Sequence, residues 1–158
     1  MCEHCGCREI EPIAELMDEH YALLDEAHLI RQALAEGDRS AALGRIQHLV
    51  AHLHTHVTKE EEGIFTALRN LDEFVDEVEQ LEKEHVMLDD GIGGLDPSSP
   101  GFEQAVTALL AELEEHVERE NLGIFPVSVV TLGAEGWDRV DRARSDHPTF
   151  LDGEQTAR

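Results

Sequence analysis

Residues 56–65 read HVTKEEEGIF, and residues 116–125 read HVERENLGIF. The two segments align at a constant offset of 60, six of the ten positions are identical, and Lys59 is matched by Arg119. Each copy contains the pattern His-x-x-x-Glu, which places an imidazole and a carboxylate one turn apart on the same face of a helix. The repeat therefore predicts two similar helices, each presenting a His and a Glu in the same direction.

Helical spacing of apolar residues continues on both sides of each copy of the repeat. Pro12 suits the first turn of a helix, where its missing N–H costs nothing, and Gly37 suits a helix end. Pro126 is expected to kink the end of its helix rather than to stop it at once. We expect four long helices over about residues 10–37, 38–71, 72–91 and 99–132, with Asp38 or Ser40 capping the second and Asp72 the third, and a short fifth helix over residues 137–144.

These elements predict an all-α protein, because no strand pattern of useful length is present. Short connections between long amphipathic helices force neighbours to run antiparallel, so an up-down-up-down four-helix bundle is expected. We predict three parts: a Cys-rich N-terminal tail over residues 1–9, the bundle over residues 10–132, and a short helix with a C-terminal tail over residues 133–158.

Depth within this bundle indicates that the His and Glu residues of the repeat lie near two further histidines. Each half of the chain also has one lone His directly after a Glu, as Glu19-His20 and Glu84-His85. Counted from the bundle end where the first and third helices begin, all the candidate residues lie roughly 14–24 Å deep at the rise of an α-helix. One site is therefore predicted, with six candidate metal ligands: His20, His56, Glu60, His85, His116 and Glu120.

Four imidazoles and two carboxylates suit a pair of metal ions, since a carboxylate can bridge two cations about 3.5–4 Å apart. Nitrogen and oxygen donors without thiolate favour Fe, Mn or Zn. Six ligands exceed what a closed tetrahedral zinc site uses, so two Fe ions are favoured, with Mn or Zn as alternatives. A ferritin-like di-iron bundle would carry Glu-x-x-His on two helices, and here only Glu82 and His85 have that spacing.

The charge of the chain excludes several classes of partner. The 158 residues include 12 Lys and Arg against 35 Asp and Glu, for a formal net charge of −23. Such a surface repels phosphate backbones and anionic lipid headgroups, so neither nucleic acid nor a membrane is expected as a partner. No signal-peptide core and no apolar run of membrane-spanning length is present, and a cytoplasmic location is expected.

All three cysteines, Cys2, Cys5 and Cys7, lie beside His4 at the N-terminus. An odd number of cysteines packed this closely does not form a secreted disulfide framework. The cluster could bind zinc or sense redox state, or it could be a frayed tail that carries thiols.

The order His, His-x-x-x-Glu, His, His-x-x-x-Glu resembles the hemerythrin-like (HHE cation-binding) family, over roughly residues 10–125. The resemblance implies a four-helix bundle around an oxo- or hydroxo-bridged non-heme di-iron centre that binds dioxygen or related small molecules. On this hypothesis the four histidines are terminal ligands, and Glu60 and Glu120 bridge the two ions.

The chain departs from the oxygen-carrying members in its third helix, where they have His-x-x-x-His. Here His85 has Leu81 one turn before it and Asp89 one turn after it. One imidazole is therefore missing unless Asp89 or another group replaces it. Glu61, directly after a candidate ligand, could orient a ligand imidazole through a hydrogen bond, or it could simply be an exposed charge. Three functions are left open: binding or handling of O2, H2O2 or NO; an enzyme that decomposes peroxide or reduces NO; and an iron or redox sensor without catalysis.

Overall fold

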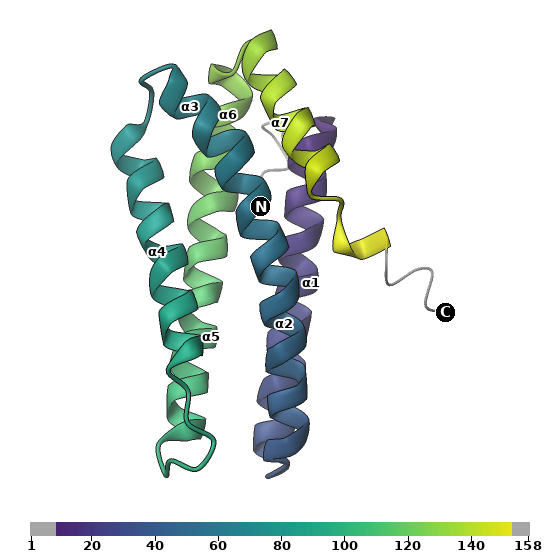
Figure 1. The fold of residues 1–158 in the computed structure, drawn as a ribbon, viewed down its shortest axis with the longest axis vertical. Coiled ribbons are helices and arrows are strands. Elements are labelled where there is room, and N and C mark those ends of the chain that lie inside the picture. The colour runs from purple at the N-terminus through teal and green to yellow at the C-terminus, as the bar shows by residue number, and fades with distance from the viewer. Residues whose placement is uncertain (1–8, 153–158) are drawn as a thin grey trace.

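The computed structural model describes residues 9–152, and the Cys2, Cys5 and Cys7 cluster lies outside them. Four long helices run antiparallel to their neighbours along the molecule (Figure 1). They are α1 (Glu11–Ala35), α2 (Arg39–Glu60), α4 (Val75–Gly93) and α5 (Phe102–Arg119). The described residues contain no strand, and the expected all-α bundle is confirmed.

Two of these helices continue through a π-helical turn into a further helical segment. After α2 come η2 (Glu61–Phe65) and α3 (Thr66–Asn70), and after α5 come η3 (Glu120–Ile124) and α6 (Phe125–Thr131). The two π-helical turns lie in corresponding parts of the sequence repeat. The continued helices therefore match the expected end points of the second and fourth helices, with Pro126 inside the first turn of α6 rather than at a stop.

The starts of two helices differ from the expected positions. The third helix, α4, begins at Val75 and has Phe74 as its N-cap residue, so Asp72 lies two residues too early to cap it; Asp72 and Phe74 both have positive φ, of 55° and 53°. The fourth, α5, begins at Phe102 rather than at residue 99. By contrast, Asp38, one of the two caps expected for the second helix, does cap α2, and its carboxylate accepts from the backbone N–H of Ala41 at 2.9 Å.

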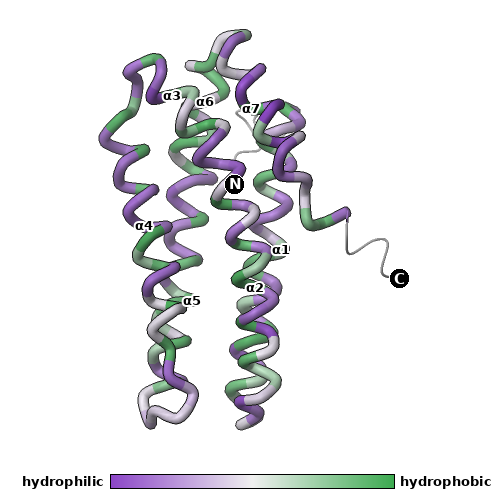
Figure 2. Tube along the Cα trace, in the orientation of Figure 1, coloured by the Kyte–Doolittle hydropathy of each residue, from purple (hydrophilic) through white to green (hydrophobic). Residues whose placement is uncertain are grey.

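The apolar core is divided into two clusters along the bundle. One contains Leu23, Ile30, Leu49 and Phe102, and the other contains Ile13, Phe65, Leu68 and Phe125 together with residues of the last helix. Apolar segments recur along all four long helices in Figure 2, with polar segments between them. Between the clusters lies a layer of buried polar residues, which holds the candidate site.

The last helix, α7 (Ala134–Asp146), packs outside the bundle against η2. Gly63 permits this approach, since a Cβ there would lie 3.3 Å from the Cβ of Ala143. The chain then turns back over α2, where the Phe150 ring stacks on His52 with centroids 4.2 Å apart. The C-terminal region expected beyond residue 133 thus covers one side of the bundle as far as Asp152.

Within residues 9–152, none of the helices has the length and apolar character needed to cross a lipid bilayer.

Candidate metal centre

The six predicted ligand residues converge in the buried polar layer. Their donor atoms form two groups, each within 4.8 Å, and both groups contain Glu60 and Glu120. We call His20 and His56, with these two carboxylates, the first half-site, and His85 and His116 with the same carboxylates the second half-site. The structure brings all six together, while their coordination of metal stays a prediction.

The two glutamates lie between the half-sites. Glu60 Oε1 is 2.8 Å from His56 Nε2, and its Oε2 is 3.3 Å from His85 Nε2. Glu120 Oε1 is 3.1 Å from the Nε2 atoms of both His20 and His116. Each carboxylate therefore faces one imidazole from each half-site, which is the arrangement that bridging of two cations requires.

The outer nitrogen of every imidazole is hydrogen-bonded, and in each case the partner is a side chain from another helix. His56 Nδ1 donates to Glu19 Oε1 and His116 Nδ1 to Glu84 Oε1, both at 2.8 Å. His85 Nδ1 donates to Glu61 Oε1 at 2.9 Å, and His20 Nδ1 to Asn121 Oδ1 at 2.8 Å. An Nδ1–H held in this way leaves the Nε2 lone pair directed into the centre, as metal-binding histidines require.

The atoms that face the centre have no such partners. The Nε2 atoms of His20, His56 and His85, and both carboxylate oxygens of Glu60 and Glu120, are buried without a well-formed hydrogen bond. Buried polar atoms are normally satisfied, and leaving them unpaired is costly. A cation among these atoms would satisfy all of them at once, so the residues present fit a metal centre.

The electrostatics of the metal-free centre also favour a positive charge. Burial alone would lower the pKa of His20, but the neighbouring Glu120 and Glu60 carboxylates outweigh it and raise that pKa to about 10. Burial would likewise lower the pKa of His85, but the same two carboxylates outweigh it and raise that pKa to about 12. The imidazoles in turn hold the pKa of Glu60 far below its usual range, against burial and the Glu120 charge. Protons therefore occupy the place that a metal cation would take.

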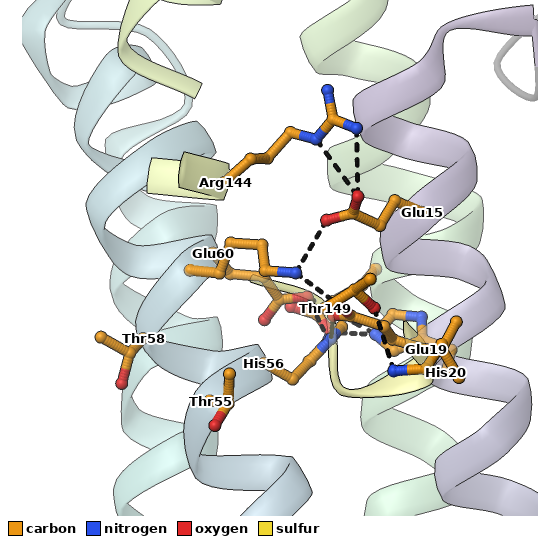
Figure 3. A network of polar contacts seen from close by, with 12 residues as sticks. Glu15, Glu19, His20, Thr55, His56, Thr58, Glu60, Arg144 and Thr149 are labelled. Atoms are coloured by element: carbon orange, nitrogen blue, oxygen red, sulfur yellow. Dashed lines mark hydrogen bonds and ion pairs between the residues drawn. The ribbon is translucent and has the colours of Figure 1, made fainter. Parts of the chain in front are cut away.

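A chain of ionic contacts surrounds the first half-site (Figure 3). Lys59 is only 2% exposed, and its Nζ donates to Glu19 Oε2 at 2.6 Å and to Glu15 Oε1 at 2.8 Å. Arg144 of α7 donates to the other oxygen of Glu15 at 3.0 Å. The carboxylate of Glu19 that holds His56 is thus itself held by a buried ammonium, and the last helix holds Glu15, the other partner of that ammonium.

The second half-site has an equivalent but more open contact. Arg119, the counterpart of Lys59 in the repeat, donates from Nε to Glu84 Oε1 at 3.0 Å. Its side chain is 49% exposed, whereas Lys59 is 2% exposed. The two halves are therefore related by a pseudo-twofold arrangement that is broken on the outside.

Three residues of the centre were not predicted as functional from the sequence: Glu19, Glu84 and Asn121. Glu19 and Glu84 had a signal, because each stands directly before a lone His at corresponding positions of the two halves. Asn121 had none, since it aligns with Glu61 and shares only the ability to accept a hydrogen bond. Of the two residues left open, Glu61 binds His85 Nδ1, whereas Asp89 is outside both ligand groups.

Comparison with protein families identifies a domain that covers most of the chain. The family model described as Hemerythrin HHE cation binding domain matches residues 11–128, which spans all six candidate ligands. Neither the curated proteins nor the solved structures gave a significant match.

Proposed function

The chain belongs to the hemerythrin HHE cation-binding domain family, and we propose that it is a cytoplasmic non-heme di-iron protein that binds dioxygen, peroxide or nitric oxide. The observation that supports this most is the pair of overlapping donor groups that share Glu60 and Glu120. Two separate metal sites would not need to share both carboxylates. A pair of carboxylates shared between two nearby cations neutralises charge that the ligands of a single ion could not.

The donor set favours iron. His20 and His56 would hold one ion, His85 and His116 the other, and Glu60 and Glu120 would bridge them. Imidazole and carboxylate donors without sulfur are compatible with Fe or Mn, and six ligands are more than a closed zinc site uses. When bound, the two irons would supply redox chemistry and a coordination position for a small molecule.

The missing imidazole supports a small-molecule function. Leu81 is buried and apolar, and Asp89 is exposed, so neither stands in for it. The second half-site therefore offers fewer protein ligands than the oxygen-carrying pattern. With a net charge of −23, a neutral small molecule is also a more suitable partner than nucleic acid or a lipid surface.

Metal analysis tests this proposal. Protein produced with iron should contain about two Fe per chain, and Glu120→Ala should lose most of it, because one carboxylate serves both ions. Glu118→Ala, an exposed position two residues earlier on the same helix, is the matched control and should keep its iron. A well-folded protein that never takes up more than one metal ion would contradict the di-iron proposal.

A second candidate function is favoured by the same open position. An enzyme that decomposes peroxide or reduces nitric oxide would use it for turnover rather than for reversible binding. Turnover with either substrate should then vanish in Glu60→Ala. Stable binding of O2 without turnover of peroxide or NO would argue against this candidate.

A further inference from the structure

A groove of about 210 Å³ lies between α2 and α4 and ends at the second half-site. Its polar lining consists of His54, Thr58, Glu61, His85 and Asp89, and apolar residues of the same two helices complete it. Thr58 points away from the ionic contacts of the first half-site in Figure 3, toward the other side of α2. The groove therefore leads from the surface to an imidazole of the centre and to the carboxylate that holds it.

The corresponding place beside the first half-site is built differently. By the offsets that relate the two halves, the equivalent seam lies between α1 and α5, and it carries Leu24 where the groove has Asp89. Leu24 is partly buried against the core. Arg31 of α1 and Glu114, the counterpart of His54, form an ion pair across this seam. An apolar side chain and an ion pair thus stand where the groove is open.

Exposure of the residues behind the imidazoles follows the same division. In the first half-site His20 is 1% exposed and Glu19, behind His56, is fully buried, whereas in the second His85 is 6% exposed and Glu84, behind His116, is 9% exposed. On the outside of the first half-site, Arg144 closes over Glu15, and Phe150 covers His52. Solvent therefore approaches the second half-site more closely than the first.

We propose that small molecules reach the centre through the groove between α2 and α4 and bind at the second half-site, and that Asp89 and Glu61, which both line the groove, select against anions. The proposal rests on the proposed function, since it assigns a route and a position to the small molecule. Two carboxylates that line this path repel an anion, while neutral NO, O2 or H2O2 feels no net Coulomb force.

Stopped-flow measurements on the iron-loaded protein test the route, with NO as the neutral probe and azide as the anion. Thr58→Trp, which fills the groove, should slow association of both probes at least tenfold while iron content and helical circular dichroism stay unchanged. Glu118→Trp is the matched control, because Glu118 is the counterpart of Thr58 in the repeat and is exposed. Its rates should stay within twofold of the unmodified protein.

The charge selection has its own matched pair. Asp89→Asn should raise the ratio of azide to NO association rates at least threefold at low salt, and added salt should reduce the difference because it screens exposed charges. Asp90→Asn makes the same change in net charge one position away, and its ratio should stay near that of the unmodified protein. Equal effects of the two variants would overturn the selection by Asp89.

Dissolved oxygen gives a reading on the metal-free protein. Paramagnetic broadening of methyl NMR signals under oxygen pressure should be greater at Leu53 and Val57 in the groove than at their counterparts Leu113 and Val117, and Thr58→Trp should abolish that excess. Equal association rates in Thr58→Trp and the unmodified protein would overturn the route alone. An iron-loaded protein that responds to neither NO nor azide would overturn the proposed function and the route with it.

Discussion

The four imidazoles of the centre differ in what holds them from behind. His56, His85 and His116 donate to carboxylates, whereas His20 donates to the amide of Asn121. A carboxylate partner raises the basicity of an imidazole and strengthens it as a ligand. The second half-site therefore has two strengthened imidazoles and the first has one, so two bound ions would not be equivalent.

Replacing the hydrogen-bond partners behind His85 and His20 gives a prediction at the residue scale. Glu61→Gln should weaken metal binding at the second half-site by about tenfold, the lower end of the range for partners of ligand imidazoles. Asn121→Asp should strengthen the first half-site, and the two Mössbauer doublets of loaded protein should change in separation in both variants. Chelator competition measures the affinities, and equal weakening by both variants would contradict the assignment.

The pH dependence of metal binding follows from the raised imidazole pKa values. In the metal-free protein, the pKa values of about 10 for His20 and about 12 for His85 keep both imidazoles protonated at neutral pH. Metal must displace these protons, so the apparent affinity should rise by at least about tenfold per pH unit between pH 6 and 8. Chelator competition at fixed ionic strength measures this rise, and a flat profile would contradict it.

Stability of the metal-free protein should change in the opposite sense. The raised pKa of His20 contributes stability that is fully present below its ordinary value of 6.5 and is lost as pH rises toward about 10. The lowered pKa of Glu60 contributes stability that is present above 4.5 and is lost on acidification. Thermal unfolding in the presence of a chelator should therefore show the greatest stability between pH 4.5 and pH 6.5, the ordinary pKa values of these two groups.

At the scale of the element, each of the two π-helical turns lets one continuous helix supply both a candidate ligand and an aromatic ring that packs on the centre. Each lies directly at the Glu of the repeat, where the extra residue per turn shifts the register of the helix that follows. Phe65 and Phe125 then stack on His85 and His20, with ring centroids 5.6 and 5.4 Å apart. Each π-helical turn thus connects a ligand of one half to an aromatic cover for the other.

The matched glycines of these two turns give the element-scale prediction. A Cβ at Gly63 would lie 3.3 Å from Ala143 Cβ and 3.5 Å from Val140 Cα, whereas a Cβ at Gly123 would meet nothing within 4 Å. Gly123→Ala should therefore gain about 0.5–1 kcal/mol from the reduced freedom of the unfolded chain. Gly63→Ala should lose that gain, because α7 has to move.

Thermal unfolding of the two glycine variants measures the difference, and the comparison is internal because the two positions correspond in the repeat. A lower midpoint for Gly123→Ala than for Gly63→Ala would contradict the packing described for α7.

The sequence indicated the four helices well but not their interruptions. Apolar periodicity and the Asp38 cap predicted the long helices because both are local signals. A π-helical turn keeps nearly the same apolar spacing as an α-helix, so no pattern in residues 61–65 indicated it. The late start of α4 had no signal either, since Phe74 takes a left-handed conformation that its own side chain does not favour.

At the scale of the molecule, the common depth of the six ligands could be predicted because antiparallel helices of equal rise keep corresponding residues at one level. The pairing of each imidazole with a partner from another helix could not, because it depends on how the helices are rotated about their axes. The cover that α7 provides was also beyond the sequence, since it requires close approach at Gly63. These tertiary contacts make the two halves of a repeated sequence unequal.

Metal removal tests the molecule as a whole. The polar layer divides the core into two clusters, and most of its inward-facing atoms have no well-formed hydrogen bond. A metal that binds only the folded state stabilises it by about 2.7 kcal/mol at 100 times its Kd. For a chain of this size, about 2–4 °C per kcal/mol then predicts that chelation lowers the unfolding midpoint by roughly 5–10 °C.

Salt separates this effect from the general repulsion of an acidic chain. With a net charge of −23, the metal-free protein should become more stable as NaCl screens its surface charges. MgCl2 at equal ionic strength should add little, because Mg²⁺ prefers oxygen ligands and does not suit a centre with four imidazoles. Fe²⁺ should raise the midpoint at micromolar concentration, where screening is negligible, and Glu120→Ala should abolish that rise but keep the response to NaCl. If NaCl alone brought the unfolding midpoint of the chelator-treated protein back to that of the iron-loaded protein, the loss on chelation would come from surface charge and not from the centre.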